Sequence, residues 1–198
     1  VIAGVSLNGA QIQGLRDLGV RVFATEPETI DQVIESILTI GLITDAQVAA
    51  QEVAAKMRAD KQYVIDKVSG LTEDRKKKVY VEYDPLWTAG RGSFLDEIIT
   101  LSGGINIAAD LDKWAQISAE AVIEADPDVI IYAEVDDYET GQPLIETIRN
   151  RPGFSEITAM RSGALVGINA DIISRYGPRI TDALTQVAKG VYPELFSE

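Results

Sequence analysis

The 198-residue chain contains no cysteine and no histidine. Without cysteine, disulfides, thiolate catalysis, zinc–cysteine sites and cysteine-ligated iron–sulfur clusters are excluded. Without histidine, the chain lacks the commonest general base, the serine–histidine–aspartate triad and the usual side-chain ligand of transition metals. An enzyme built from this chain would have to work with carboxylates, Lys, Tyr, Ser or a cofactor.

Positive charge is also scarce, since 18 Lys and Arg face 31 Asp and Glu, for a formal net charge of −13. Nonspecific nucleic-acid binding needs clustered basic residues, so we expect no nucleic-acid partner. The same acidity disfavours adsorption to anionic lipid. No apolar run approaches the roughly 20 residues that a membrane-spanning helix needs.

The most prominent predicted element is a helix over residues 45–69, in which apolar side chains recur every three to four positions. Asp45 is its predicted N-cap, and Gly70 its predicted stop. The segments on both sides alternate between strand and helix patterns. We therefore predict a brace that joins two α/β lobes. The pattern alone leaves open an ordinary crossover helix within a single domain.

The first lobe is predicted to have strands over residues 1–5 and 20–24 and helices over 10–18 and 29–40. This order implies a parallel sheet. Two strands do not make a self-sufficient sheet, so either the lobe continues upstream or another chain supplies strands, and we expect a dimer or strand exchange. The predicted domains are residues 1–44 (remainder of the first lobe), 45–70 (interlobe helix) and 71–198 (second lobe).

The second lobe is predicted to contain three strands, four helices with defined ranges, and a further short helix that follows the turn over residues 151–154. The strands are placed over residues 79–83, 129–133 and 164–168, and the helices over 94–101, 118–125, 143–150 and 178–189. Ser93 and Ser118 are the predicted N-caps of the first two helices. Residues 84–93 are predicted to form a loop.

Two loops carry the candidate binding residues. The loop over residues 83–93 lies between a strand and a helix, where open α/β sheets bind ligands. Tyr83 and Trp87 offer flat apolar surface, Arg91 a charge-assisted donor, and Gly90 and Gly92 backbone amides near a ligand. In the alternative interpretation, Trp87 packs onto its own lobe.

The second such loop, residues 169–178, places Arg175 and Tyr176 at the same crevice, unless Tyr176 packs on the last helix and Arg175 is solvated. The acidic loop with Asp136, Asp137 and Glu139 has oxygen ligands suited to hard cations. Its spacing matches no calcium loop, so a solvated turn is favoured.

The chain resembles the class III solute-binding proteins of ABC importers, whose members bind cobalamin, haem or ferric siderophores, and it is most similar in style to the cobalamin-binding members. The resemblance rests on the order of residues 1–4, 15–22, the long helix, 90–104, 117–131 and 174–179. It implies two Rossmann-like parallel-sheet lobes joined by one rigid helix, with the N-terminal part of the first lobe missing. It also implies a binding protein rather than an enzyme, periplasmic or lipid-anchored on the outer face of the membrane.

The resemblance further implies a corrinoid ligand held between the lobes, with a ferric siderophore or haem as alternatives and a doubly wound enzyme as a remote rival. No resident cofactor is expected. The residues expected to face the ligand are Ser6, Leu7, Asn8, Tyr83, Trp87, Arg91, Ile172, Ser174, Arg175 and Tyr176. Glu120 is expected to dock onto Arg residues of the membrane permease; its alternative role is to stabilise the helix dipole from the first turn.

Overall fold

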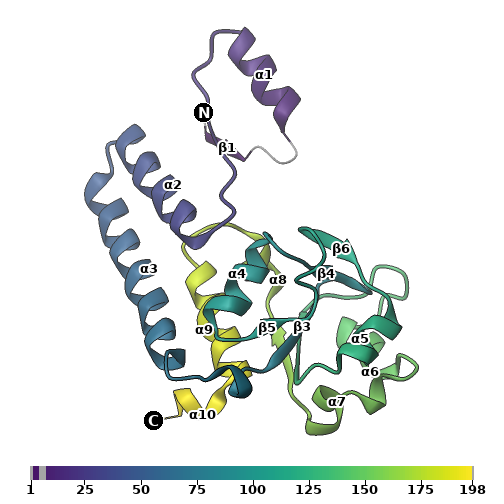
Figure 1. The fold of residues 1–198 in the computed structure, drawn as a ribbon. Helices are drawn as coiled ribbons and strands as arrows, with labels where there is room; N and C mark the ends of the chain where they lie inside the picture. Colours follow the sequence, from purple (N-terminus) through teal and green to yellow (C-terminus); the bar gives the residue numbers. More distant parts are fainter. Residues whose placement is uncertain (1, 5–7, 198) are drawn as a thin grey trace. The chain divides into compact units, whose positions relative to one another are not determined.

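The computed structural model describes residues 2–4 and 8–197, without the side chains of Ile2, Ala3 and Ser174. The chain forms two compact units, Val1–Lys56 and Met57–Glu198. Figure 1 shows the α/β organisation of both. No helix in the described residues is both long enough and apolar enough to cross a membrane.

Unit 1 (Val1–Lys56) contains a parallel pair of strands, β1 (Ile2–Gly4) and β2 (Phe23–Thr25), connected by α1 (Gly9–Asp17). Next comes α2 (Ile30–Ile43), whose N-cap Thr29 accepts a hydrogen bond from the backbone N–H of Gln32 at 3.2 Å. The predicted strand–helix–strand–helix order is therefore confirmed. The expected dimer or strand exchange stays a prediction.

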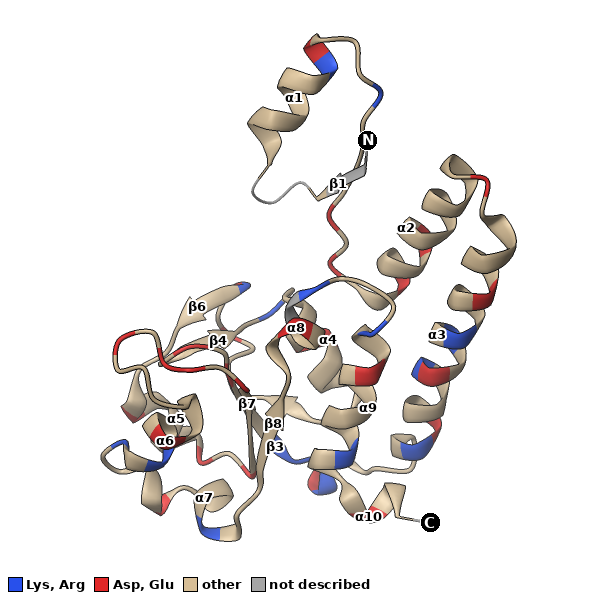
Figure 2. Ribbon diagram, turned by 180° about the vertical axis from the view of Figure 1, so that it is seen from behind, with Lys and Arg blue, Asp and Glu red and all other residues tan. Residues whose placement is uncertain are grey.

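The long helix is a single element, α3 (Gln47–Val68), and the division between the two units falls within it. The predicted N-cap was wrong, because Asp45 adopts a φ of 56° in the turn before the helix. Gly41 of α2 lies so close to α3 that a Cβ there would come within 2.4 Å of the Ala50 Cβ. Charged residues recur along the length of α3 (Figure 2), which fits an amphipathic helix. The three-part domain division stays a prediction.

Unit 2 (Met57–Glu198) is built on a four-stranded parallel sheet in the order β5-β3-β7-β8. The strands are β3 (Lys78–Glu82), β5 (Ile105–Asn106), β7 (Val129–Ala133) and β8 (Leu165–Ile168). As Figure 1 shows, α4 (Phe94–Leu101) and α9 (Ile180–Val191) cover one face. On the other face lie α5 (Ala119–Ala125), α6 (Leu144–Asn150) and α7 (Thr158–Ser162). The fold is doubly wound, as expected.

Local sequence signals specify much of this lobe. Ser93 and Ser118 cap α4 and α5 as predicted, accepting from the Asp96 and Ala121 amides at 3.2 and 3.1 Å. The remaining short elements are η1 (Glu73–Arg75), η2 (Phe154–Glu156), α8 (Ala170–Ser174) and α10 (Pro193–Phe196). Since α8 occupies part of residues 169–178, that stretch is not the continuous loop that was predicted.

The prediction of a loop over residues 84–93 was also wrong in part. This stretch contains β4 (Trp87–Ala89), which pairs antiparallel with β6 (Trp114–Gln116). Trp87 lies opposite Gln116, and Ala89 lies opposite Trp114. A local pattern cannot show such a ladder, because its partner strand is distant in the sequence.

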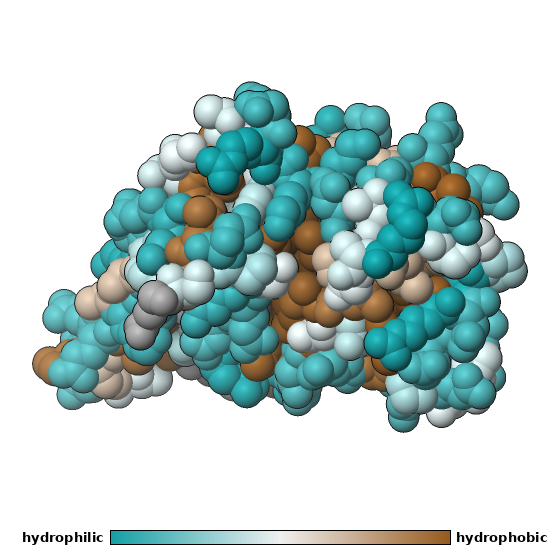
Figure 3. Space-filling view, turned by 90° about the horizontal axis from the view of Figure 1, so that it is seen from below, coloured by the Kyte–Doolittle hydropathy of each residue, from teal (hydrophilic) through white to brown (hydrophobic). Residues whose placement is uncertain are grey.

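The core follows the alternation of side chains along the strands. On the side of α5 and α6, one cluster of buried residues comprises Tyr80, Val122, Ile130, Leu144, Ile148, Phe154, Ile157 and Ala159. The protein face in Figure 3 is mostly hydrophilic, with apolar side chains gathered near its middle.

The apolar interior of unit 2 also contains a charge pair. The Glu82 carboxylate is fully buried, and Arg151 binds it through two N–H···O contacts of 2.7 and 2.6 Å. The Tyr80 hydroxyl donates to the same carboxylate at 2.8 Å, and the Arg151 guanidinium lies over the Phe154 ring. Burial, assisted by the Glu82 charge, raises the pKa of Tyr80, so the hydroxyl keeps its proton. Burial alone would lower the pKa of Arg151, but its hydrogen bonds and attraction to Glu82 raise it.

Removing one member of this pair should destabilise unit 2 strongly. We expect Arg151→Met to lower the free energy of unfolding by about 3–5 kcal/mol, because Glu82 would be left buried and unpaired. The triple variant Tyr80→Phe/Glu82→Leu/Arg151→Met removes every polar member and should recover most of that loss. Urea unfolding followed by tryptophan fluorescence measures this in unit 2, which contains both tryptophans. Wild-type stability of Arg151→Met would contradict this account.

Candidate ligand site

A pocket of about 570 Å³ opens on unit 2 beside the β4–β6 strand pair. It is lined by Tyr83, Asp84, Trp87, Trp114, Val135 and Tyr176. Tyr83 and Asp84 directly follow β3, and Val135 follows β7. The pocket therefore lies outside the carboxyl ends of two parallel strands, the usual place for ligands in open α/β sheets.

Four aromatic side chains form most of the pocket wall, and contacts with neighbouring rings hold three of them in place. Tyr83 meets Trp114 edge to face, with ring centroids 5.6 Å apart, and Tyr176 stacks on Phe94 at 5.0 Å. Trp87 and Trp114 are each 40% exposed, although both are large apolar groups. Such half-exposed flat rings in a concave site suit a flat apolar ligand surface.

Backbone hydrogen bonds fix the turn over residues 83–87 and the β4–β6 strand pair that present these rings. The Tyr83 amide donates to the Trp87 carbonyl at 3.0 Å, and the Trp87 amide donates to the Asp84 carbonyl at 2.8 Å. The Gly90 amide donates to the Lys113 backbone carbonyl, and the Gly92 amide donates to the Asp96 carboxylate. The expectation that these glycine amides are free for a ligand was therefore wrong. A Cβ at Gly90 would come within 2.2 Å of the Leu111 carbonyl oxygen, which explains the glycine there.

The pocket carries an acidic side chain where the sequence led us to expect two arginines, Arg91 and Arg175. Among the described residues that line it, Asp84 is the sole charged residue, and neither Lys nor Arg is present. Arg91 contacts Asp112 at 3.2 Å and Arg175 contacts Asp171 at 2.9 Å, both on the surface. The structure thus brings Tyr83, Trp87 and Tyr176 together but leaves Arg91 and Arg175 outside the lining.

Other sequence-predicted ligand residues lie elsewhere. Ile172 is on α8 and does not line the pocket. The Asn8 side chain, in unit 1, donates to the Gly4 carbonyl at 3.2 Å. Ser6, Leu7 and the Ser174 side chain lie outside the described part of the structure. The binding roles of all these residues stay predictions.

Sequence reasoning missed three lining residues, Asp84, Trp114 and Val135. Trp114 had a usable signal, because the chain has only two tryptophans and a tryptophan in a polar stretch often marks a binding surface. Asp84 lies within the predicted loop over residues 83–93 and Val135 follows the predicted strand over residues 129–133, but nothing in the sequence singled out these two side chains.

The acidic loop around Asp137 is organised from within. The Asp137 carboxylate is buried and accepts hydrogen bonds from the Glu139 amide (2.9 Å), the Thr140 amide (3.1 Å) and the Thr147 hydroxyl (2.7 Å). No group of three Asp or Glu side chains in the described residues is arranged to hold a metal ion. Instead of a solvated carboxylate, the loop uses Asp137 as an internal acceptor.

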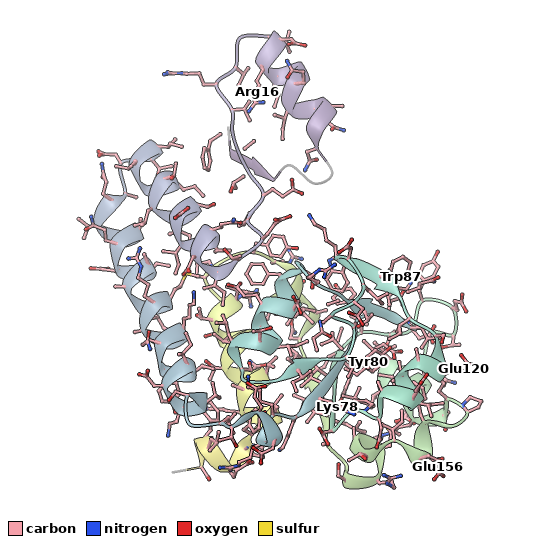
Figure 4. All side chains as sticks on the ribbon, in the orientation of Figure 1. Arg16, Lys78, Tyr80, Trp87, Glu120 and Glu156 are labelled. Atoms are coloured by element: carbon pink, nitrogen blue, oxygen red, sulfur yellow. The ribbon has the colours of Figure 1, made fainter. Side chains whose placement is uncertain are left out.

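Glu120 is exposed in the first turn of α5 (Figure 4), where its charge interacts favourably with the helix dipole. Figure 4 also places Trp87 on β4 and Tyr80 inside the unit.

Comparisons with known proteins agree with this architecture. The model of a family described as periplasmic binding protein matches residues 5–172. An uncharacterised ABC transporter substrate-binding lipoprotein of Bacillus subtilis is 26% identical over 99% of this chain and 62% of its own length. A cobalamin-binding protein of Halobacterium salinarum is 30% identical over 97% of this chain and 53% of its own. The chain therefore spans less than two thirds of these curated relatives.

Among solved structures, the periplasmic heme-binding protein RhuT from Roseiflexus superposes with a TM-score of 0.83 at 24% identity, over 98% of this chain and 76% of that one. At this identity, the likeness concerns the fold.

The hydrogen bonds to Asp137 should make the stability of unit 2 pH-dependent. The Thr147 hydroxyl, followed by two loop amides, lowers the pKa of the Asp137 carboxyl below its usual value of about 3.9. A carboxyl with a lower pKa when folded contributes stability above the unfolded pKa and loses it as pH falls through the folded pKa. We therefore expect the stability difference between wild type and Asp137→Asn to be constant from pH 7 to 5 and to shrink below about pH 4.

Urea midpoints at pH 7, 5, 4 and 3, from tryptophan fluorescence, measure this difference. Thr147→Val removes the hydrogen bond that contributes most to the lowered pKa of Asp137. In this variant, the stability difference should therefore change less between pH 4 and pH 3. A difference that stays the same at every pH would show that Asp137 titrates normally.

Proposed function

The chain belongs to the periplasmic binding protein family, and on that premise we propose that it captures a corrinoid outside the cytoplasmic membrane and delivers it to the permease of an ABC importer. Its relatives include a protein named for cobalamin binding and one named as an ABC substrate-binding lipoprotein. As in those proteins, the proposed task is binding, and no bond is broken.

The lining of the unit 2 pocket carries this proposal. A corrinoid presents a broad, nearly flat ring whose rim bears neutral carboxamides. Haem has two propionates and many ferric siderophores are anionic, so these ligands favour sites with Arg or Lys donors. Among its described lining residues, the pocket offers four aromatic rings and a carboxylate but no basic side chain. Its chemistry therefore favours the amide-rimmed macrocycle over haem or an anionic siderophore.

In the proposed complex, the aromatic rings cover apolar surface of the macrocycle and exclude water from it. Trp87 and Trp114 lose their remaining exposure, which supplies hydrophobic free energy without ordering a flexible chain. The chain contains no histidine, so it has no imidazole to ligate cobalt. The metal of such a cargo would travel inside its own macrocycle.

The proposed contact with the permease is made by Glu120. Its carboxylate is exposed on α5, and none of the interactions found among the described residues uses it. An exposed acid of this kind is suited to pair with an Arg of a partner. Support for this role comes from the family resemblance of residues 117–131 rather than from local geometry.

Ligand titration tests the first proposal. Cyanocobalamin should quench the tryptophan fluorescence with saturation, and haem or a ferric siderophore should do so more weakly. Trp114→Ala should weaken cyanocobalamin binding about tenfold or more, as expected of a central aromatic anchor, with Trp87 still reporting. Trp114→Phe should cost less. Tyr138→Ala, at a loop residue that is 93% exposed and outside the lining, is the matched control. Absence of saturable quenching by cyanocobalamin would refute the proposal that the ligand is a corrinoid.

Glu120→Arg tests docking separately. Charge reversal should leave cyanocobalamin affinity unchanged and reduce cyanocobalamin uptake by the reconstituted importer about tenfold, since like charges would face each other at the contact. Glu156→Arg makes the same change at an exposed residue that Figure 4 shows away from Glu120. Equal uptake by both variants would exclude Glu120 from the contact.

A further inference from the structure

Asp84 occupies a defined position in the pocket. It is the residue after Tyr83 at the carboxyl end of β3, and its carbonyl accepts a hydrogen bond from the Trp87 amide at 2.8 Å in the turn that leads from β3 into β4. Leu86, within the same turn, has a φ of 58°. The turn fixes the backbone of Asp84 beside the aromatic wall.

The Asp84 carboxylate has no polar partner among the described residues. Three arginines of the same unit are each paired with another acid, Arg91 with Asp112, Arg151 with Glu82 and Arg175 with Asp171. The side chain is partly buried, and its neighbours in the lining are aromatic rings and Val135. A charged acceptor is thus held at a pocket wall without a hydrogen-bond donor from any residue that the structure describes.

We propose that Asp84 is the specificity-determining residue of this pocket, accepting N–H groups from carboxamides at the rim of the ligand and rejecting ligands that carry carboxylates there. The inference rests on the proposed corrinoid function and adds the feature that selects among tetrapyrrole-like macrocycles. A carboxylate accepts a charge-assisted hydrogen bond from an amide N–H. Against a ligand carboxylate, the same group is a like charge in an apolar surround, where repulsion is screened little.

Selection of this kind depends on the repulsive element as much as on the attractive one. The aromatic walls bind the face of any flat macrocycle and do not distinguish amide from acid. Among the described lining residues, only Asp84 responds to the charge of the rim. In this proposal, the aromatic rings supply affinity for any flat macrocycle. The Asp84 carboxylate supplies the selectivity between amide and acid rims.

A matched pair of probes tests the inference, namely dicyanocobyrinic acid heptaamide and the corresponding heptacarboxylate. They share ring and metal and differ at the rim. Fluorescence titration at pH 7 gives the dissociation constants for the wild type, Asp84→Asn and Glu156→Gln. Glu156→Gln makes the same change in net charge at an exposed residue of η2, away from Trp87 in Figure 4.

Asp84→Asn should reduce the preference for the heptaamide about tenfold or more, by weakening heptaamide binding and strengthening heptacarboxylate binding. Glu156→Gln should leave the ratio of the two constants within about twofold of wild type, since its effect is long-range and screened. Asp84→Glu retains the charge and should retain the preference. Urea midpoints check that the variants are folded, and Asp84→Ser replaces Asp84→Asn if the latter is not.

The outcomes separate this inference from the proposed function. If wild type binds the heptaamide and Asp84→Asn keeps the full preference, or shifts it no more than Glu156→Gln, Asp84 is not the determinant and the corrinoid function stands. If wild type binds neither probe nor cyanocobalamin, both proposals fall.

Discussion

A buried carboxylate can remain charged inside a protein only if something compensates for its lost hydration, and in this chain Arg151 does so for Glu82. The two N–H···O hydrogen bonds from Arg151 to Glu82 fix the end of β3 against the segment that follows α6. Tyr83 and Asp84, the next residues along the chain, line the pocket. The strand end that carries the buried pair therefore also positions the candidate site, and the geometry of one depends on the other.

The alternation of the strand explains how both arrangements fit in so short a stretch. Tyr80 and Glu82 point to the same side of the sheet, where the hydroxyl meets the carboxylate among the apolar side chains of α5 and α6. Immediately beyond, the chain leaves the sheet and turns into β4, so its side chains line an open pocket rather than a packed core. Because the ion pair resists displacement, the aromatic wall is preorganised, and binding need not order it.

Much of the fold was predictable because it is specified locally. The strands β3, β7 and β8 appear as short apolar runs, and Ser93 and Ser118 mark the starts of α4 and α5. The β4–β6 ladder was not predictable, since each partner is a three-residue strand whose pairing is visible only in space. The same limit hid the pairing that brings Trp114 beside Trp87, although the scarcity of tryptophan in the chain was itself a usable signal. For Arg91 the neutralising acid, Asp112, is also distant in the sequence, whereas Asp171 lies one helical turn before Arg175 and that ion pair was readable.

The acidity of the chain and the acidity of the pocket act over different distances. A net charge of −13 repels anions in general, but at physiological salt this field is screened within about 8 Å of the surface. It therefore slows encounters with anionic ligands without deciding which group of a bound ligand is accepted. That decision requires a charge inside the contact, where solvent is displaced. In the described lining only Asp84 supplies one, and for this reason the proposed discrimination between macrocycles of nearly the same shape is assigned to Asp84 and not to the rings.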